Sequence, residues 1–241
     1  MGNTDMKPHD ENEAWLIWSA IGLAALLPFV GSYFYFVVAG DSPVARAGYA
    51  AVKVFTVLWP ILVIRLLLKR PVHFRRSSRI SLKRSLVEGM GVGLGLGALI
   101  LGVLESPLGE MVRHSADSIA AKVDDLGIRS YYWIFALALS FGHSLLEEYY
   151  WRGFVFGQMR ERMPVRWAHG LAGCAFALHH MIICSQYFPV PWGLVLGASV
   201  AVGGIIWSFL YVRHGHFWGA WLSHMIVDLV LVSIGYQLIS A

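Results

Sequence analysis

Long apolar runs separated by short polar stretches dominate this chain. Each run holds about 20 predominantly apolar residues, which is the length that a helix needs to cross a bilayer. Runs this long and unbroken do not fit barrel strands, so the pattern predicts an all-α, polytopic transmembrane helix bundle. We expect about seven spans, at residues 15–38, 47–68, 86–104, 131–156, 167–185, 192–211 and 217–238.

The charges of the connecting loops alternate along the chain. Lys and Arg are in excess in segments 65–85, 157–166 and 212–216, whereas acidic residues are in excess in 105–130 and segment 186–191 has no charge. Because loops rich in Lys and Arg stay in the cytoplasm, this alternation predicts a cytoplasmic N-terminus and an external C-terminus. Segment 107–126 would add an eighth span if it entered the membrane, but its charges favour an amphipathic segment on the surface.

Composition supports the membrane interpretation. The chain is 57% hydrophobic and only 14% charged, with a mean hydropathy of +0.59, whereas soluble domains carry about 25% charged residues. Its net charge of +4 does not indicate a nucleic-acid partner, because the positive charges crowd one loop. That loop orients the chain and could contact anionic lipid; its charges are Arg65, Lys69, Arg70, Arg75, Arg76, Arg79, Lys83 and Arg84.

Small residues mark one face of the third run. Gly89, Gly93 and Gly97 are spaced by four and so share one side of a helix, where small residues let a second helix approach closely. We expect tight helix packing there, with a hinge as the alternative. Cys174 and Cys184 are about 15 Å apart along one predicted helix, so no disulfide forms between them within it.

Three charges interrupt the fourth run, in the stretch Glu147-Glu148-Tyr149-Tyr150-Trp151-Arg152. One charged side chain at the bilayer centre costs about 2.5–3.5 kcal/mol, and such residues are usually functional. Glu148 and Arg152 are one helical turn apart and can pair, which lowers that cost. Glu147 points about 100° away from this pair, and a carboxylate in a poorly hydrated cavity suits a general base.

Further ionisable side chains lie at membrane depth in three spans: His143, His179, His180, His224 and Asp228. A rise of about 1.5 Å per residue from the cytoplasmic ends places Glu147 at about 15 Å, His180 at about 20 Å, His224 at about 10 Å and Asp228 at about 16 Å. His224 and Asp228 are one turn apart, so Asp228 could orient the imidazole. This agreement in depth predicts one joint site.

The motifs of these spans resemble those of the CPBP family of intramembrane proteases, also called the ABI family, which includes CAAX prenyl endopeptidases and bacteriocin-processing enzymes. The chain reads Glu147-Glu148-Tyr149-Tyr150-Trp151-Arg152, then Phe176-Ala177-Leu178-His179-His180, then His224-Met225-Ile226-Val227-Asp228. The resemblance covers roughly residues 131–230. It implies a catalytic core at 131–241, preceded by N-terminal transmembrane helices and the basic loop at 1–130, in a bacterial inner (plasma) membrane.

The resemblance also implies roles for individual residues. Glu147 and His180 would activate the water that attacks a peptide carbonyl, and His224 with Asp228 would stabilise the oxyanion. Glu148 and Arg152 would brace the site. Asp228 stands where the family often has Asn, so it must be protonated, pair with His224 or bind another group. His143 lies one turn before Glu147 and could extend the site, but it matches no motif position. We interpret it as a satisfied core histidine, and His179, on a different face from His180, as a packing residue.

The sequence is compatible with more than one cofactor, substrate and activity. Glu147, His180 and His224 could hold zinc with water in a fourth position, but a metal-free glutamate mechanism has also been proposed for the family. The expected substrate is a membrane-associated protein or peptide, cut as a CAAX-type end, a leader or a sorting signal. The alternatives are a non-enzymatic membrane protein of the same fold, with an immunity or scaffold role, or a proton-coupled transporter.

Overall fold

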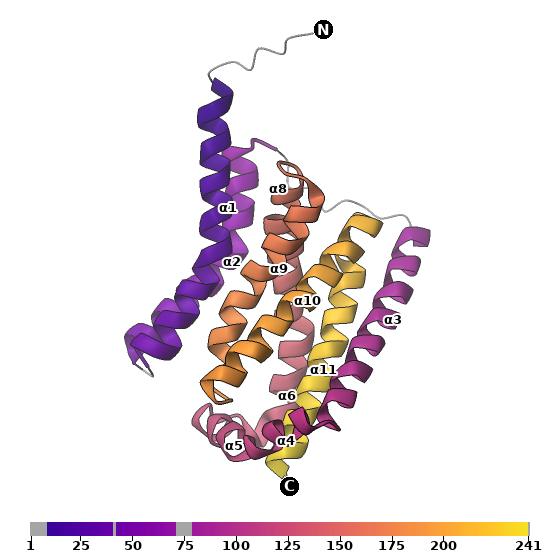
Figure 1. Ribbon diagram of the computed structural model, residues 1–241. Helices are drawn as coiled ribbons and strands as arrows, with labels where there is room; N and C mark the ends of the chain where they lie inside the picture. The colour runs from indigo at the N-terminus through magenta and orange to yellow at the C-terminus, as the bar shows by residue number, and fades with distance from the viewer. Residues whose placement is uncertain (1–8, 41, 71–78, 241) are drawn as a thin grey trace. The chain divides into compact units, whose positions relative to one another are not determined.

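The computed structural model describes residues 9–40, 42–70 and 79–240 of the chain, and within them it holds helices and no strand (Figure 1). The predicted all-α fold is therefore confirmed. Contacts divide the chain into two compact units, Met1–Phe74 and Arg75–Ala241. The division predicted at residue 130 stays a prediction. Arg75 and Arg76 of the basic loop lie outside the described residues.

The first unit is a pair of helices. Helix α1 (His9–Tyr33) continues into the π-helix η1 (Phe34–Val38), and α2 (Pro43–Leu62) continues into η2 (Val63–Leu67). Pro43 suits the first turn of α2, where its missing N–H is not needed, and the Ser42 hydroxyl caps the Ala45 amide at 3.1 Å. Trp59 donates from its indole nitrogen to the Ala20 carbonyl at 3.1 Å, which ties the two helices together.

The described part of the second unit contains four long helices and a segmented one. Three of them, α9 (Val165–Cys184), α10 (Val190–His214) and α11 (Trp218–Ser240), pack around the candidate site described below. The fourth, α3 (Arg79–Leu104), lies alongside α11. Between α3 and α9 the chain forms shorter segments: α4 (Pro107–His114), α5 (Ala116–Asp125), η3 (Arg129–Tyr131), α6 (Tyr132–Leu137), η4 (Ala138–His143), α7 (Ser144–Glu147), η5 (Glu148–Phe156) and α8 (Gly157–Arg160).

Helices α3 and α11 run parallel and touch at the predicted glycine face. A Cβ built on Gly89 would overlap the backbone of Gly219. One on Gly93 would lie 3.0 Å from the Ser223 carbonyl oxygen, and one on Gly97 would lie 3.1 Å from Val230 Cγ2. The prediction of tight packing at this face is confirmed, because side chains at these positions would push the helices apart.

Ion pairs and backbone hydrogen bonds tie the ends of the second unit. Glu88 on α3 binds Arg213 Nε at 2.6 Å and His214 Nε2 at 3.0 Å, both at the end of α10. At the other end Arg129 binds Asp124 at 2.5 Å and donates to the Ile239 carbonyl oxygen at 3.1 Å, near the end of α11. The hydrogen bond from Arg129 lowers the pKa of Asp124 below its usual value.

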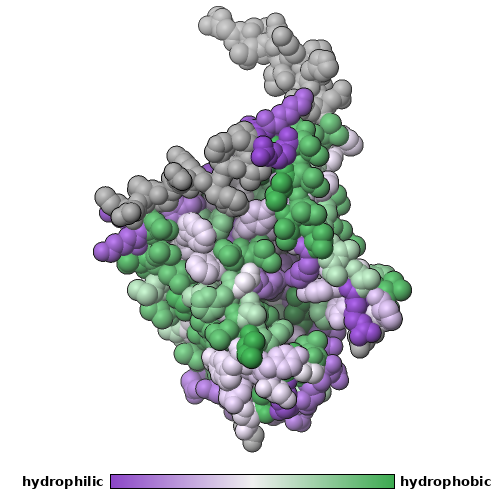
Figure 2. Space-filling view, turned by 180° about the vertical axis from the view of Figure 1, so that it is seen from behind, coloured by the Kyte–Doolittle hydropathy of each residue, from purple (hydrophilic) through white to green (hydrophobic). Residues whose placement is uncertain are grey.

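Six helices among the described residues are long and apolar enough to span a membrane: Ala14–Val38, Pro43–Leu67, Ser81–Leu104, Val165–Cys184, Val190–His214 and Trp218–Ser240. Large apolar side chains cover much of their outer surface, as Figure 2 shows for the face seen from behind. The protein is therefore an integral membrane protein.

The fourth predicted span, 131–156, is helical but segmented. The chain is helical from residue 132 to residue 160 through α6, η4, α7, η5 and α8, but this charged stretch is not among the six apolar helices. Its crossing of the membrane stays a prediction. Segment 107–126 forms α4 and α5, of 8 and 10 residues, and each is too short to cross a bilayer.

Candidate active site

Three helical segments bring the ionisable residues of the motifs into one buried cluster. The segmented helix carries Glu147, Glu148 and Arg152, α9 carries His179 and His180, and α11 carries His224 and Asp228. Glu148 and Arg152 are almost fully enclosed, and Glu147, His179 and His224 each expose less than a tenth of their surface. The predicted joint site of acids and imidazoles is thus present as a spatial cluster.

Glu148 and Arg152 form the predicted ion pair. Arg152 Nη1 lies 2.9 Å from Glu148 Oε1, one turn along the helix. The guanidinium also lies over two aromatic rings, with its central carbon 4.6 Å from the centre of Phe176 and 5.0 Å from that of Trp207. Because a planar cation stacks well on aromatic faces, these rings support the buried guanidinium of Arg152.

The ring of His224 lies among three carboxylates. Its Nδ1 is 2.8 Å from Glu148 Oε1, and since a carboxylate only accepts, the imidazole donates this hydrogen bond. Its Nε2 lies 3.6 Å from Asp228 and 3.7 Å from Glu147 Oε2. The spacing of four residues predicted the contact of His224 with Asp228. It did not predict the contact with Glu148, which is shorter and orients the ring.

Glu147 is contacted by two histidines that we interpreted as packing residues. His143 Nε2 and His179 Nε2 each lie 3.3 Å from Glu147 Oε1. The interpretation of these rings as packing residues did not anticipate their contacts with Glu147. The spacing of His143 and Glu147, one turn apart, was a signal for the first contact. His179 approaches from α9, and no pattern within one helix could have revealed it.

His180 completes the cluster through its position beside His179. Its Nδ1 is 3.0 Å from the Phe176 carbonyl oxygen, and its ring centre is 4.1 Å from that of His179. One donor atom from each of Glu147, His179 and His180 lies within 4.8 Å of the others. Zinc binds such nitrogen and oxygen donors, so the residues fit a divalent ion, which would supply an acidified water. The set differs from the predicted Glu147, His180 and His224.

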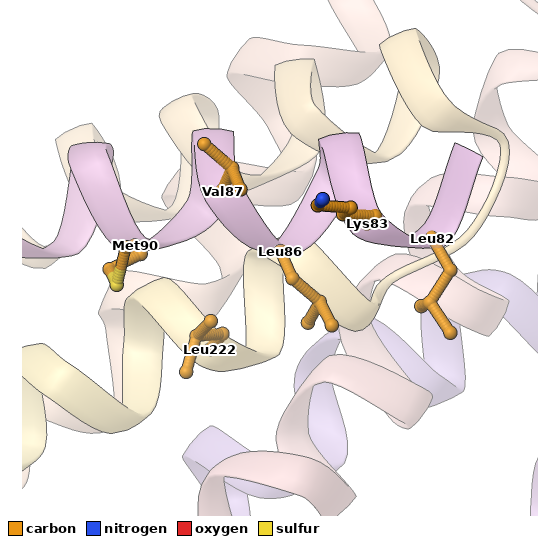
Figure 3. Close-up of a pocket in the computed structure, with 6 residues that line it drawn as sticks. All are labelled: Leu82, Lys83, Leu86, Val87, Met90 and Leu222. Atoms are coloured by element: carbon orange, nitrogen blue, oxygen red, sulfur yellow. The ribbon is translucent and has the colours of Figure 1, made fainter. Parts of the chain in front are cut away.

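An open groove of 370 Å³ lies on the surface of the same unit (Figure 3). It is lined by Leu82, Lys83, Leu86, Val87 and Met90 of α3 and by Leu222 of α11. None of these residues belongs to the buried cluster, and the lining is apolar apart from Lys83. The lining therefore contains no carboxylate or imidazole that could act on water.

Comparison with known proteins gives one match. Residues 129–230 match a family model described as type II CAAX prenyl endopeptidase Rce1-like. The matched range contains all of the predicted site residues, from Glu147 to Asp228. Searches of curated proteins and of solved structures gave no significant match.

Proposed function

Since residues 129–230 match the CAAX prenyl endopeptidase model, we propose that this chain is an intramembrane protease of the CAAX protease (CPBP) family and that it cuts a peptide bond with water activated in the buried cluster. The substrate of such a protease is a membrane-associated protein or peptide. We propose Glu147 and His180 as the pair that activates water. The contact of Glu147 with histidines from neighbouring helices is the observation that carries the proposal.

The proposed reaction begins with proton transfer from water. Glu147 accepts one proton while the water oxygen attacks the peptide carbonyl carbon, and the carbonyl oxygen becomes an oxyanion. Glu147 then returns this proton to the amide nitrogen as the carbon–nitrogen bond breaks. The products are an acid and an amine, and Glu147 is again ionised for the next cycle.

His224 is suited to stabilise the oxyanion. Glu148 accepts a hydrogen bond from its Nδ1, and its Nε2 lies beside Asp228 and Glu147, where an N–H on this nitrogen could donate to the oxyanion. One such donor contributes about 3–4 kcal/mol in a water-poor site. Asp228 lies beside His224 Nε2, which supports pairing as its role and answers the repulsion that an isolated aspartate would exert on an oxyanion.

The substitutions Glu147→Gln and His180→Ala test the proposal. Losing a general base lowers the rate by about 10²–10⁴-fold, so peptides cut by the wild type should accumulate uncut in membranes of either variant. Comparing the membrane peptides of wild-type and variant strains by mass spectrometry would also identify the substrate. Glu110→Gln, at an exposed position on α4, is the matched control and should leave cleavage unchanged.

Undiminished cleavage in both Glu147→Gln and His180→Ala would refute the protease mechanism. Proton-coupled flux across vesicles that disappears in the same variants, with no peptide cut, would instead establish the transporter alternative.

A further inference from the structure

We propose that Glu147, His179 and His180 form a binding site for a divalent transition-metal ion such as zinc. The proposed function does not require this site, because Glu147 and a histidine can activate water unaided. The site also differs from the ligand set expected from the motifs, since His179 takes the place of His224. Its geometry, its outer contacts and the position of His224 each support it.

The spacing of the donor atoms is compatible with ligands around one ion as well as with a long hydrogen bond. Glu147 Oε1 and His179 Nε2 are 3.3 Å apart, whereas N–H···O hydrogen bonds cluster near about 2.9–3.0 Å. Two ligands of a tetrahedral zinc ion, each about 2.0–2.1 Å from it, are about 3.3–3.4 Å apart. The donor atom of His180 lies within 4.8 Å of both, so a small side-chain movement would bring it to the same ion.

The contacts outside the trio prepare its rings for metal binding. Histidine ligands commonly donate their second ring N–H to a carbonyl, which leaves the other nitrogen with its lone pair. His180 makes this contact from Nδ1 to the Phe176 carbonyl oxygen at 3.0 Å, so its Nε2 is left to bind an ion. The ring of His179 is parallel to the Trp151 ring, at an angle of 4° and a distance of 5.8 Å, which fixes its orientation.

His224 is held by other partners. Its Nδ1 is bonded to Glu148 at 2.8 Å, and its Nε2 lies between Asp228 and Oε2 of Glu147, the oxygen that does not contact His179. A ring among three carboxylates is suited to donate hydrogen bonds, not to supply a lone pair to a cation. Three protein ligands with an open fourth position are the arrangement of catalytic zinc sites.

Metal binding to the purified full-length protein tests the site without reference to cleavage. The protein is stripped with a chelator, and zinc is titrated in competition with a coloured chelator. We expect one equivalent to bind. His179→Ala and His180→Ala should each weaken binding by more than about 100-fold, since losing even an outer-shell partner weakens it about 10–100-fold. His224→Ala removes an outer contact of Glu147 and should weaken binding less, by about 10–100-fold. The control His169→Ala, at a buried histidine bonded to Ser208, should bind as the wild type does.

Cobalt substitution covers the case in which His179→Ala fails to fold. His179→Cys keeps a ligand at this position, so the Co²⁺ form should show a thiolate-to-metal absorption band that the wild type lacks. Three results would each overturn the site. The wild type could bind less than one equivalent of zinc, His224→Ala could lose as much zinc affinity as His179→Ala, or folded His179→Cys could show no new absorption band. Cleavage by a wild-type protein that binds no zinc would overturn the metal site and leave the proposed function standing. Tight zinc binding by a protein that cuts no peptide would support the metal site and refute the proposed function.

Discussion

At the scale of single residues, the enclosure of Arg152 stands out. Its guanidinium is surrounded by Glu148 and the rings of Phe176 and Trp207. A buried charge that loses its partner is strongly destabilising, because neither water nor another cation replaces the lost interaction. Arg152 therefore matters for folding whether or not it takes part in chemistry.

Replacing Arg152 with Met should lower the free energy of unfolding by about 3–5 kcal/mol, since Glu148 would remain buried with His224 as its remaining ionisable partner. Unfolding of the purified protein in detergent measures this change. Arg113→Met removes an exposed pair with Glu110 and should cost no more than about 1 kcal/mol. Equal losses in the two variants would contradict the structural role of Arg152.

Asp228→Asn should keep cleavage close to the wild-type rate, because an amide can still accept from His224 and can also donate toward the substrate. Asp228→Leu should lower kcat by about 10²–10³-fold, as expected when a group supporting the oxyanion is lost. Steady-state cleavage of a substrate peptide distinguishes the two. A loss in Asp228→Asn as large as in Asp228→Leu would show that the negative charge itself is required.

The sequence predicts contacts within one helix better than contacts between helices. The pairs Glu148–Arg152 and His224–Asp228 follow from spacing alone, because residues four apart share a face. The contacts of His224 with Glu148 and of His179 with Glu147 depend on how α9 and α11 are rotated toward the segmented helix. That rotation is set by packing over the whole interface, so no local pattern contains it.

At the scale of elements, the contact of α3 with α11 combines close and open glycine positions on one helix. Gly89 touches the backbone of Gly219, whereas a Cβ on Gly91 would meet nothing within 4 Å. The difference arises because residues two apart on a helix point to different sides. The sequence revealed this face by its spacing of four but did not identify α11 as its partner.

Gly89→Ala should lower the free energy of unfolding by about 1–3 kcal/mol through overpacking against α11. Gly91→Ala should instead raise it by about 0.5–1 kcal/mol, because alanine loses less backbone entropy than glycine in a helix. Thermal unfolding of both variants in the same detergent measures the difference. Equal effects would show that α3 does not pack on α11 through this face.

At the scale of the molecule, the ends of the second unit agree with the predicted orientation. The start of α3 and the turns from α8 to α9 and from α10 to α11 lie at one end, and α4, α5 and the C-terminus lie at the other (Figure 1). The basic residues of these described segments fall at the first end: Lys83 and Arg84 near the start of α3, Arg160, Arg162 and Arg166 around the turn from α8 to α9, and Arg213 at the end of α10. We propose that this end is cytoplasmic, as the positive-inside rule requires.

Cysteine labelling tests this orientation. In a chain carrying Cys174→Ser and Cys184→Ser, Gln186→Cys should react with a membrane-impermeant maleimide in intact cells, because its loop is predicted to be external. Glu161→Cys, in the loop between α8 and α9, should react only after the membrane is opened. The opposite pattern would reverse the proposed orientation.

The crowding of Glu147, Glu148 and Arg152 in one helix has a consequence for biosynthesis. Each charge alone disfavours insertion by about 2.5–3.5 kcal/mol. Of the histidines that contact these carboxylates, His143 is on the same segment, but His179 and His224 lie on helices synthesised later. The segment from residue 132 to residue 160 is therefore the least able to leave the translocon by itself. We expect it to wait there until α9, α10 and α11 have emerged, so that the four helices enter the lipid as a group.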